Sequence, residues 1–393
     1  MARLQELTGK AMARMTLAEG LTLLLLPLSI GLFLASGVSY GYLFPEAAQG
    51  VARLALFFLP VILSKLVFDF TRIRKEIRRT VYSLYFAVLL ALFLFSPVFG
   101  YLPRPSEVER LSTLFVYLSA GMLAVYVATS LRSYGRDREG HRAVTRDHVS
   151  ALGTVTRTAL LLILCYVVIS NLKAILPLYR VYSWDPVFLK LDRLLFAGRN
   201  PYQLLHQLFP PSSSTLFFEQ FYFFFFYFNA LGLSGAFVFG SPRYLFRVAG
   251  TMVIATYIGM VLYWVFPSLG PCFYSQTAAL FDRMPETMTL KPTLYFRFLA
   301  MITAPQNYRP GLFDGIAAFP SLHVTHSLIY LIYLWPKQRV LTLLNVLPFV
   351  LLSLSTVYLG WHYVVDVPAG ALVGIAAILI VSRTFEKDPA ASP

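Results

Sequence analysis

The sequence predicts an all-α polytopic membrane protein with about ten transmembrane helices, and three observations support this fold class. Of the 393 residues, 57% are hydrophobic and only 13% are charged, whereas soluble domains average about 25% charged and 45–50% apolar residues. The apolar residues gather in runs of about 18–24, the length of a helix that crosses the hydrocarbon core of a bilayer. The basic residues, which give a net charge of +14, are concentrated in short segments between these runs.

Ten apolar runs define the predicted spans. Their boundaries are Leu21–Leu43, Ala52–Asp69, Val81–Phe99, Leu111–Leu131, Thr158–Leu178, Leu216–Phe239, Tyr244–Val265, Leu322–Trp335, Leu341–Leu359 and Tyr363–Val381. The eighth run is short, and we expect its flanks to extend it. The first run follows Arg3, Lys10 and Arg14, but it is longer than a signal-peptide core and no small-residue cleavage site follows it, so we expect it to be retained.

The charge of the connecting segments predicts the orientation in the membrane. With ten spans, the basic segments Arg72–Arg79 and Arg132–Arg157 fall on the same side as both termini, and the long segments Arg180–Thr215 and Pro267–Ser321 fall on the other. Basic loops face the cytoplasm, so we expect cytoplasmic termini and extracytoplasmic long loops. This pattern explains the net charge without a nucleic-acid partner. It suits a bacterial inner membrane and a secretory-pathway membrane equally.

The predicted spans divide the chain into two parts. Residues 1–150 form a four-span region with basic cytoplasmic loops, and residues 151–393 form a six-span region that carries all the candidate chemistry. In the second part, residues 185–209 repeat apolar side chains at helical spacing, with Lys190, Asp192 and Arg193 between them. This pattern predicts an amphipathic helix in the plane of the interface. It either covers the lipid entrance to the site or simply packs against the spans.

Three residues of the second part form the candidate catalytic group. His362 and Asp366 lie four residues apart and share one helical face. A carboxylate that accepts a hydrogen bond from one imidazole nitrogen leaves the other nitrogen free to attack an electrophile such as a phosphate ester. His323, at the start of another span and at the same membrane depth, can protonate the departing alkoxide. The pair by itself is equally consistent with a structural hydrogen bond, but the second histidine favours catalysis.

The motifs around these residues resemble those of a known family. Pro320-Ser321-Leu322-His323 resembles the PSGH signature of the type 2 phosphatidic acid phosphatase superfamily, and His362 to Asp366 resembles the end of its third signature. The segments Ala317–His323, Ser355–Gly370 and Gly270–Tyr274 are most similar to the inositol phosphorylceramide synthase branch. The resemblance covers about residues 158–382.

The resemblance implies a six-helix catalytic core, a phosphohistidine intermediate, no metal and no cofactor. His362 would be the nucleophile, Asp366 its orienting carboxylate and His323 the general acid and then base. Ser321, in the same motif as His323, would bind the phosphate.

The sequence also departs from the family pattern. Ser355-Thr356 replaces the Ser-Arg that usually begins the third signature. The Lys-x6-Arg-Pro signature is not present as such, although Tyr308-Arg309-Pro310 offers an Arg-Pro. A transferring phosphoryl group requires cationic donors, and Arg309 is the first candidate, with Lys291 and Arg297 behind it. Each is alternatively an ordinary loop cation.

Several further polar residues are weaker candidates. His326 shares roughly the same face as His323, and Tyr358 and Tyr363 flank His362, but helix packing and interfacial tyrosines are the more ordinary interpretations. Glu219 is a candidate for binding the acceptor hydroxyl. Lys173 either meets the site or only extends toward the interface.

These observations leave three hypotheses for function. The first is a lipid phosphotransferase that moves phosphoinositol from phosphatidylinositol to a hydroxyl acceptor such as ceramide. The second is a lipid phosphatase that uses the same residues with water as the acceptor. The third, a non-catalytic transporter or scaffold, is disfavoured because the polar groups lie at the membrane boundary and not near the midplane. A phospholipid donor and a lipid acceptor are the expected partners, and a partner subunit is left open.

Overall fold

The computed structural model describes residues 16–37, 63–71, 75–95, 122–282, 284, 290–307 and 315–385. These residues are almost entirely helical and contain no strand. The helices are α2 (Leu17–Ala35), α4 (Lys75–Phe95), α6 (Arg138–Tyr179), α7 (Asp185–Leu195), α8 (Pro201–Leu208), α9 (Pro211–Gly235), α10 (Pro242–Val265), α11 (Ala278–Phe281), α12 (Leu290–Thr303), α13 (Leu322–Leu334), α14 (Arg339–Tyr358) and α15 (Asp366–Phe385). The α9 helix continues into a π-helical turn at Ala236–Gly240, and a short 3-10 turn spans Pro305–Asn307.

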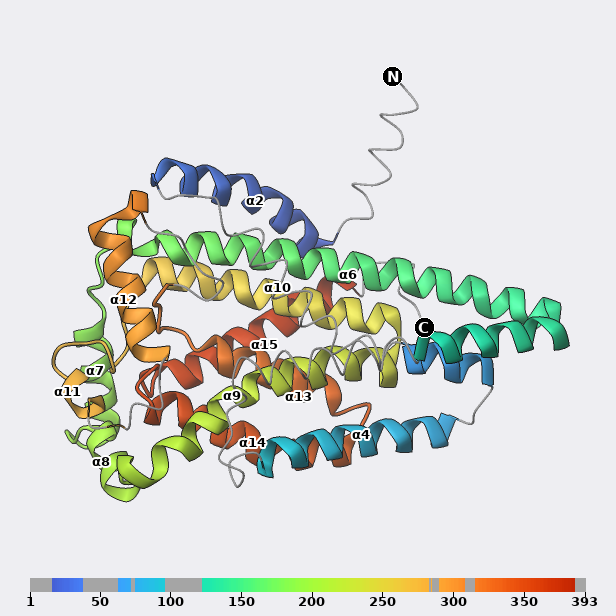
Figure 1. Cartoon of the computed structure of the whole chain (residues 1–393). Coiled ribbons are helices and arrows are strands. Elements are labelled where there is room, and N and C mark those ends of the chain that lie inside the picture. The colour runs from blue at the N-terminus through green and yellow to red at the C-terminus, as the bar shows by residue number, and fades with distance from the viewer. Residues whose placement is uncertain are drawn as a thin grey trace.

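Six helical segments in the described part of the chain are long and apolar enough to cross a membrane. They are Leu17–Ala35, Arg138–Tyr179, Pro211–Gly240, Pro242–Val265, Arg339–Tyr358 and Asp366–Thr384. The long apolar helices run side by side in one bundle (Figure 1). The integral membrane fold predicted from the sequence is therefore confirmed. These segments correspond to the first, fifth, sixth, seventh, ninth and tenth predicted spans.

The remaining predicted spans have different outcomes. The third coincides with α4, and most of the second and the fourth lie outside the described residues. The expected extension of the eighth was wrong, because α13 has only 13 residues. At 1.5 Å per residue it is about 20 Å long, shorter than a hydrocarbon core. A Pro-Ser turn ends it on one side and a turn after Trp335 ends it on the other.

The short α13 helix nevertheless lies in the middle of the bundle. It packs against α9, α10, α14 and α15, and α10 also packs against α6 and α15. Large side chains such as Tyr330 and Ile329 are buried where these helices meet. These six helices (α6, α9, α10, α13, α14 and α15) form the core that positions the site, and we call them the six-helix core.

The charged segment before the fifth span is helical and forms part of α6. Asp137 caps this helix by accepting a hydrogen bond from the Gly140 amide at 2.8 Å. The 42 residues of α6 continue without a break into the span. Figure 1 shows its N-terminal part extending beyond the other long helices, at the end of the bundle opposite α7, α8 and α11.

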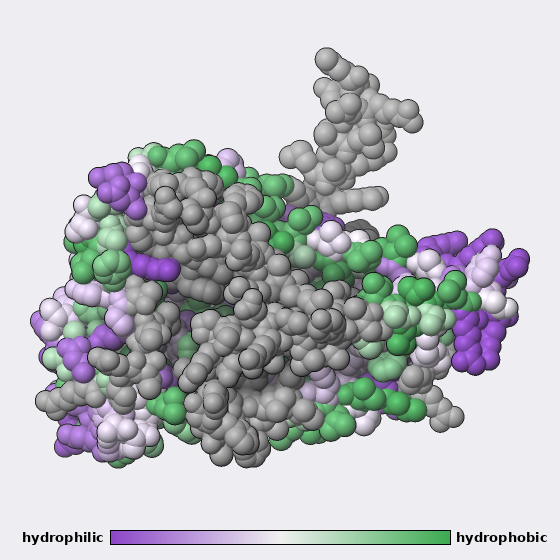
Figure 2. Space-filling view, viewed as in Figure 1, coloured by the Kyte–Doolittle hydropathy of each residue, from purple (hydrophilic) through white to green (hydrophobic). Residues whose placement is uncertain are grey.

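The surface is apolar between two polar ends. Figure 2 shows hydrophilic residues gathered at both ends of the molecule and hydrophobic residues between them. Leucines on the sides of the bundle are exposed, such as Leu24 at 67% and Leu347 at 64%. Exposing such an apolar surface to water is unfavourable, whereas lipid tails solvate it. We call the end that carries α7, α8 and α11 the loop end.

Candidate active site

The His362 side chain is buried and its protonation state follows from its contacts. Its Nδ1 lies 2.6 Å from the backbone oxygen of Ala318 and 3.3 Å from Oδ2 of Asp366. Both of these oxygens accept hydrogen bonds, so Nδ1 carries the proton and donates to them. The Nε2 atom is then left with its lone pair. An imidazole held in this way can act as a nucleophile.

Asp366 begins α15 and is fully buried. Its Oδ2 atom also accepts a hydrogen bond from the Tyr363 amide at 2.8 Å, which fixes the turn that carries His362. Its Oδ1 atom has no hydrogen-bond partner in the described part of the chain. The loop that precedes the carboxylate therefore holds it in place, and one of its buried oxygens accepts no hydrogen bond from the described residues.

The two histidine motifs meet through close backbone contacts. The Ser321 amide donates to the Asp366 carbonyl at 3.2 Å. The Thr325 hydroxyl donates to the Gly370 carbonyl at 2.8 Å. A Cβ atom on Gly370 would lie only 2.4 Å from the Ser321 carbonyl oxygen, so the approach of α13 to α15 requires glycine at this position.

This contact places His323 beside His362. The centroids of the two imidazole rings are 5.7 Å apart. The His323 ring packs between Tyr222 and Phe225 of α9, at centroid distances of 4.7 and 4.6 Å. The aromatic run Phe221–Phe228 thus packs within the protein around one histidine of the pair, as well as against neighbouring helices.

Two carboxylates of α7 hold the loop that carries His362, and the sequence interpretation missed both roles. Asp192 is fully buried and accepts hydrogen bonds from the amides of Val364 and Val365 at 2.9 and 3.1 Å, and from the Tyr202 hydroxyl. The sequence interpretation placed Asp192 on the polar face of an amphipathic helix. The structure turns Asp192 inward, toward backbone donors that no sequence pattern displays, whereas Lys190 and Arg193 are exposed.

Asp185, seven residues earlier on the same face of α7, performs a similar task. It accepts hydrogen bonds from the amides of Leu269 and Gly270 and, at 2.8 Å, from the Tyr363 hydroxyl. Burial raises the pKa of Asp185 and of Asp192, and their hydrogen bonds oppose that rise. The spacing of seven residues was the available signal, because it places two acidic side chains on one helical face.

The predicted single helix over residues 185–209 is also corrected. Two helices, α7 and α8, occupy this segment, and the chain reverses between them with positive φ angles at Ala197 and Gly198. Asn200 caps α8 by accepting from the Tyr202 amide at 3.0 Å. On α7 the apolar Leu191, Leu194 and Leu195 are exposed whereas Phe188 and Leu189 are buried, so apolar side chains lie on both faces of the helix.

The predicted phosphate-binding residues lie in different places. Ser321 is fully buried between α13 and α15, and its hydroxyl has no partner within the described residues. The Nε2 atom of His326 contacts the Thr256 hydroxyl at 2.9 Å, on the side of α10. The Tyr358 hydroxyl donates to the Phe209 carbonyl at 3.0 Å, and the Tyr363 hydroxyl donates to Asp185. Both tyrosines are thus occupied in packing the loop end.

The candidate cations are also dispersed. Lys291 on α12 forms an ion pair with Asp282 at 3.0 Å, and Arg297 lies on the same helix. Arg309 lies outside the described residues. Lys173 on α6 contacts Gly315, just before the PSLH motif, and its positive charge acts on His323. Glu219 is buried on α9.

The described residues contain no group of three or more His, Cys, Asp or Glu side chains arranged to hold a metal ion. What they do contain is a buried imidazole with a free Nε2, a carboxylate on its Nδ1 side and a second imidazole nearby. These are the groups that a phosphoryl transfer through histidine requires. The fold and the site together define a helical membrane protein with this chemistry available at one end.

Comparison with known proteins supports the same class. A family model described as the PAP2 superfamily matches residues 189–380, a segment that includes both histidine motifs. This match indicates phosphatase or phosphotransferase chemistry for that part of the chain. The comparisons with curated proteins and with solved structures each gave no match.

Proposed function

We propose that the protein is a lipid phosphotransferase that works through a phosphohistidine on His362. The observation that carries this proposal is the 2.6 Å contact between Nδ1 of His362 and the Ala318 carbonyl oxygen. Because a carbonyl oxygen accepts and never donates, this contact places a proton on Nδ1, so that in the neutral ring Nε2 carries the lone pair and is the nucleophile. His323 lies beside it, with the centroids of the two imidazole rings 5.7 Å apart.

In the first step, Nε2 of His362 attacks the phosphorus atom of a phospholipid. The bond from phosphorus to the diacylglycerol oxygen breaks, and that oxygen takes a proton from His323. The phosphohistidine carries positive charge on its ring, and Asp366, on the Nδ1 side, stabilises that charge. Diacylglycerol leaves, and the phosphorylated head group stays on His362.

In the second step, a hydroxyl group of the acceptor gives its proton to His323 and attacks the same phosphorus atom. The bond from phosphorus to Nε2 breaks, and its electron pair returns to the imidazole. His362 and His323 are then restored to their starting states. Such a two-step exchange has the kinetics of covalent catalysis.

The negative charge of the transferring phosphoryl group requires cations. Lys173 is a candidate among the described residues, because it lies against Gly315, just before the PSLH motif. Ser321 supplies a buried hydroxyl next to the pair. Lys291 and His326 remain candidates that substrate binding would have to bring closer, and Arg309, outside the described residues, remains a candidate from the sequence alone.

Two features favour a lipid acceptor over water. His362 is only 4% exposed, and aromatic side chains of α9 surround His323. A site that excludes water protects a phosphohistidine from hydrolysis. The inositol phosphorylceramide synthase-like motifs add phosphatidylinositol as donor and ceramide as acceptor to the proposal, without metal. We further propose that the loop end is extracytoplasmic and that residues 1–150 form a four-span membrane region with basic cytoplasmic loops.

The test uses the full-length protein in lipid nanodiscs containing labelled phosphatidylinositol and ceramide, with EDTA present. The wild type should release diacylglycerol and form a phosphoinositol-bearing lipid, and His362→Ala should form neither. Mass spectrometry identifies the products. Release of inositol phosphate without an acceptor product would support hydrolysis instead, and a requirement for added metal would contradict the metal-free mechanism. Equal turnover by wild type and His362→Ala would refute the phosphohistidine.

A further inference from the structure

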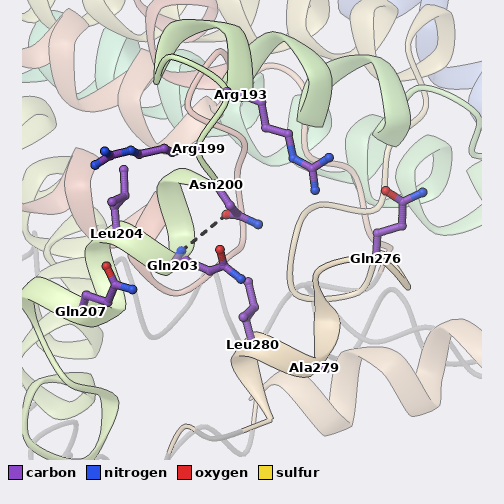
Figure 3. A pocket seen from close by; sticks show the side chains of 10 residues that line it. Arg193, Arg199, Asn200, Gln203, Leu204, Gln207, Gln276, Ala279 and Leu280 are labelled. Carbon is purple, nitrogen blue, oxygen red and sulfur yellow. Dashed lines mark hydrogen bonds between the residues drawn. The ribbon is translucent and has the colours of Figure 1, made fainter.

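A cavity lies at the loop end, between α7, α8 and α11. Its volume is about 580 Å³, within the range of small-molecule sites, about 300–1,000 Å³. Figure 3 shows the side chains that line it, which come from two stretches of the chain, residues 193–207 and 276–280. The polar ones are Arg193, Arg199, Asn200, Gln203, Gln207 and Gln276. None of the candidate catalytic residues lines this cavity.

The lining combines positive charge with neutral hydrogen-bonding groups. Arg193 and Arg199 supply two guanidinium groups, no carboxylate lines the cavity, and neither arginine forms an ion pair with any described residue. The Oδ1 atom of Asn200 is used in capping α8, where it accepts from the amides of Tyr202 and Gln203 (Figure 3). Its NH2 group remains available as a donor.

We propose that this cavity binds a phosphate ester that carries several hydroxyl groups. Guanidinium groups bind phosphate oxygens in paired, charge-assisted hydrogen bonds. The side-chain amides of Gln203, Gln207 and Gln276 each offer both a donor and an acceptor, which is what hydroxyl groups require. An anion without hydroxyls would leave these amides unused.

The surroundings of the cavity suit a ligand at a lipid surface. Leu194 and Leu208 each follow a lining residue directly and are 67% and 72% exposed. Exposed leucines beside a cationic cavity are the arrangement expected where acyl chains meet head groups. The same chemistry is offered by a phosphorylated polyol head group of a lipid and by a free phosphorylated polyol, and the experiment below separates them.

Helices α7 and α8 contribute to both the cavity and the support of the candidate active site, but the cavity is distinct from that site. On α7, Arg193 lines the cavity while its neighbour Asp192 faces the loop of His362. On α8, Gln203 lines the cavity while its neighbour Tyr202 donates to Asp192. The inference therefore goes beyond the proposed reaction and stands even if His362 proves not to be a nucleophile.

The test measures binding in a background that cannot turn over. All proteins carry His362→Ala and are reconstituted in phosphatidylcholine nanodiscs. Equilibrium dialysis with labelled myo-inositol 1-phosphate should show saturable binding that weakens about tenfold or more in the double variant Arg193→Gln/Arg199→Gln, because two charged hydrogen-bond donors are lost. The matched control is Lys190→Gln, which removes an exposed charge of α7 outside the cavity and should leave binding unchanged.

Two further binding measurements identify the ligand. Inorganic phosphate should bind more weakly than inositol phosphate, and equal binding would overturn the role assigned to the amides. Native mass spectrometry is then applied to nanodiscs containing phosphatidylinositol. If the ligand is a lipid head group, the control should retain the lipid and the double variant should lose it. Saturation by the soluble probe alone would identify a free phosphorylated polyol. Equal binding of every ligand by the double variant and the control would refute the site.

Discussion

At the scale of single residues, the candidate nucleophile depends on a contact with the main chain. The Ala318 carbonyl lies closer to Nδ1 of His362 than the Asp366 carboxylate does, at 2.6 against 3.3 Å. The backbone is therefore sufficient to fix the tautomer. The carboxylate has a separate role, which is to stabilise the positive charge that the ring acquires when its Nε2 bonds to phosphorus.

Asp366→Asn should separate these two roles. Nδ1 keeps its proton because Ala318 still accepts it, but the stabilising charge is lost. We expect transfer to slow by about a hundredfold to a thousandfold, the usual effect of removing one group that stabilises transition-state charge. The measurement is the rate of diacylglycerol release by the variant and the wild type in nanodiscs. A rate as low as that of His362→Ala would show that Asp366 also fixes the tautomer, and an unchanged rate would remove it from the mechanism.

At the scale of elements, α7 joins the loop that carries His362 to the loop around Gly270. Asp192 holds the amides of Val364 and Val365, and Asp185 holds the Gly270 loop and Tyr363. Both carboxylates are buried although α7 lies at the loop end and exposes leucines outward. The helix therefore holds the His362 loop in place through these hydrogen bonds.

Asp192→Asn should weaken the hydrogen bonds between α7 and the His362 loop. The amide side chain has one oxygen for the two backbone donors at Val364 and Val365, so one buried donor loses its acceptor. We expect the free energy of unfolding to fall by about 1–3 kcal/mol, the cost of leaving such a group unpaired, with transfer activity reduced as well. Thermal unfolding in nanodiscs measures the first effect. Lys190→Gln on the same helix is the control, and an equal effect of both variants would contradict the role assigned to Asp192.

Gly370→Ala tests the contact between α13 and α15. The added Cβ would lie 2.4 Å from the Ser321 carbonyl oxygen, so the helices must move apart and carry His323 away from His362. We expect a large loss of transfer activity in protein that still inserts and folds. Gly153→Ala in α6 is the matched control, because its Cβ would meet nothing within 4 Å. Full activity of Gly370→Ala would show that the spacing of the two helices does not matter for the reaction.

At the scale of the whole molecule, the two ends of the bundle differ in composition. The N-terminal part of α6, with Arg138, Arg142 and Arg146, extends at one end, and the candidate active site lies at the other with α7 and α8 (Figure 1). The apolar belt between the ends spans the membrane (Figure 2). The positive-inside rule then predicts that the site faces away from the cytoplasm.

Cysteine labelling in intact cells tests that orientation. Gln276→Cys places a thiol at the loop end, and Arg142→Cys places one at the opposite end, both at exposed positions. Cys165 and Cys272 are buried, so they give little background. A membrane-impermeant maleimide should label Gln276→Cys in intact cells and Arg142→Cys only after permeabilisation. The reverse result would place the site in the cytoplasm.

Much of the fold was predictable because membrane insertion depends on local composition. Apolar runs and basic segments predicted the six long spans and their alternation, with small errors at the ends. The apolar run Leu322–Trp335 gave the length of α13, but the expected extension was wrong, because a Pro-Ser turn that packs against α15 begins the helix at Leu322. The continuous helix from Arg138 was missed for a related reason, since a charged segment forms a helix as readily as a loop when it is capped and extends a span.

The candidate site, like the fold, was predictable only in part. The sequence by itself determined His323, His362 and Asp366 as the candidate group, because motif spacing and span alternation place them at one membrane depth. Only the tertiary structure decided which partners hold them: the Ala318 carbonyl on Nδ1, the Asp192 and Asp185 carboxylates under the His362 loop, and the aromatic rings around His323. These contacts join backbone atoms and side chains far apart in the chain, and a backbone donor or acceptor has no signature in the amino-acid sequence.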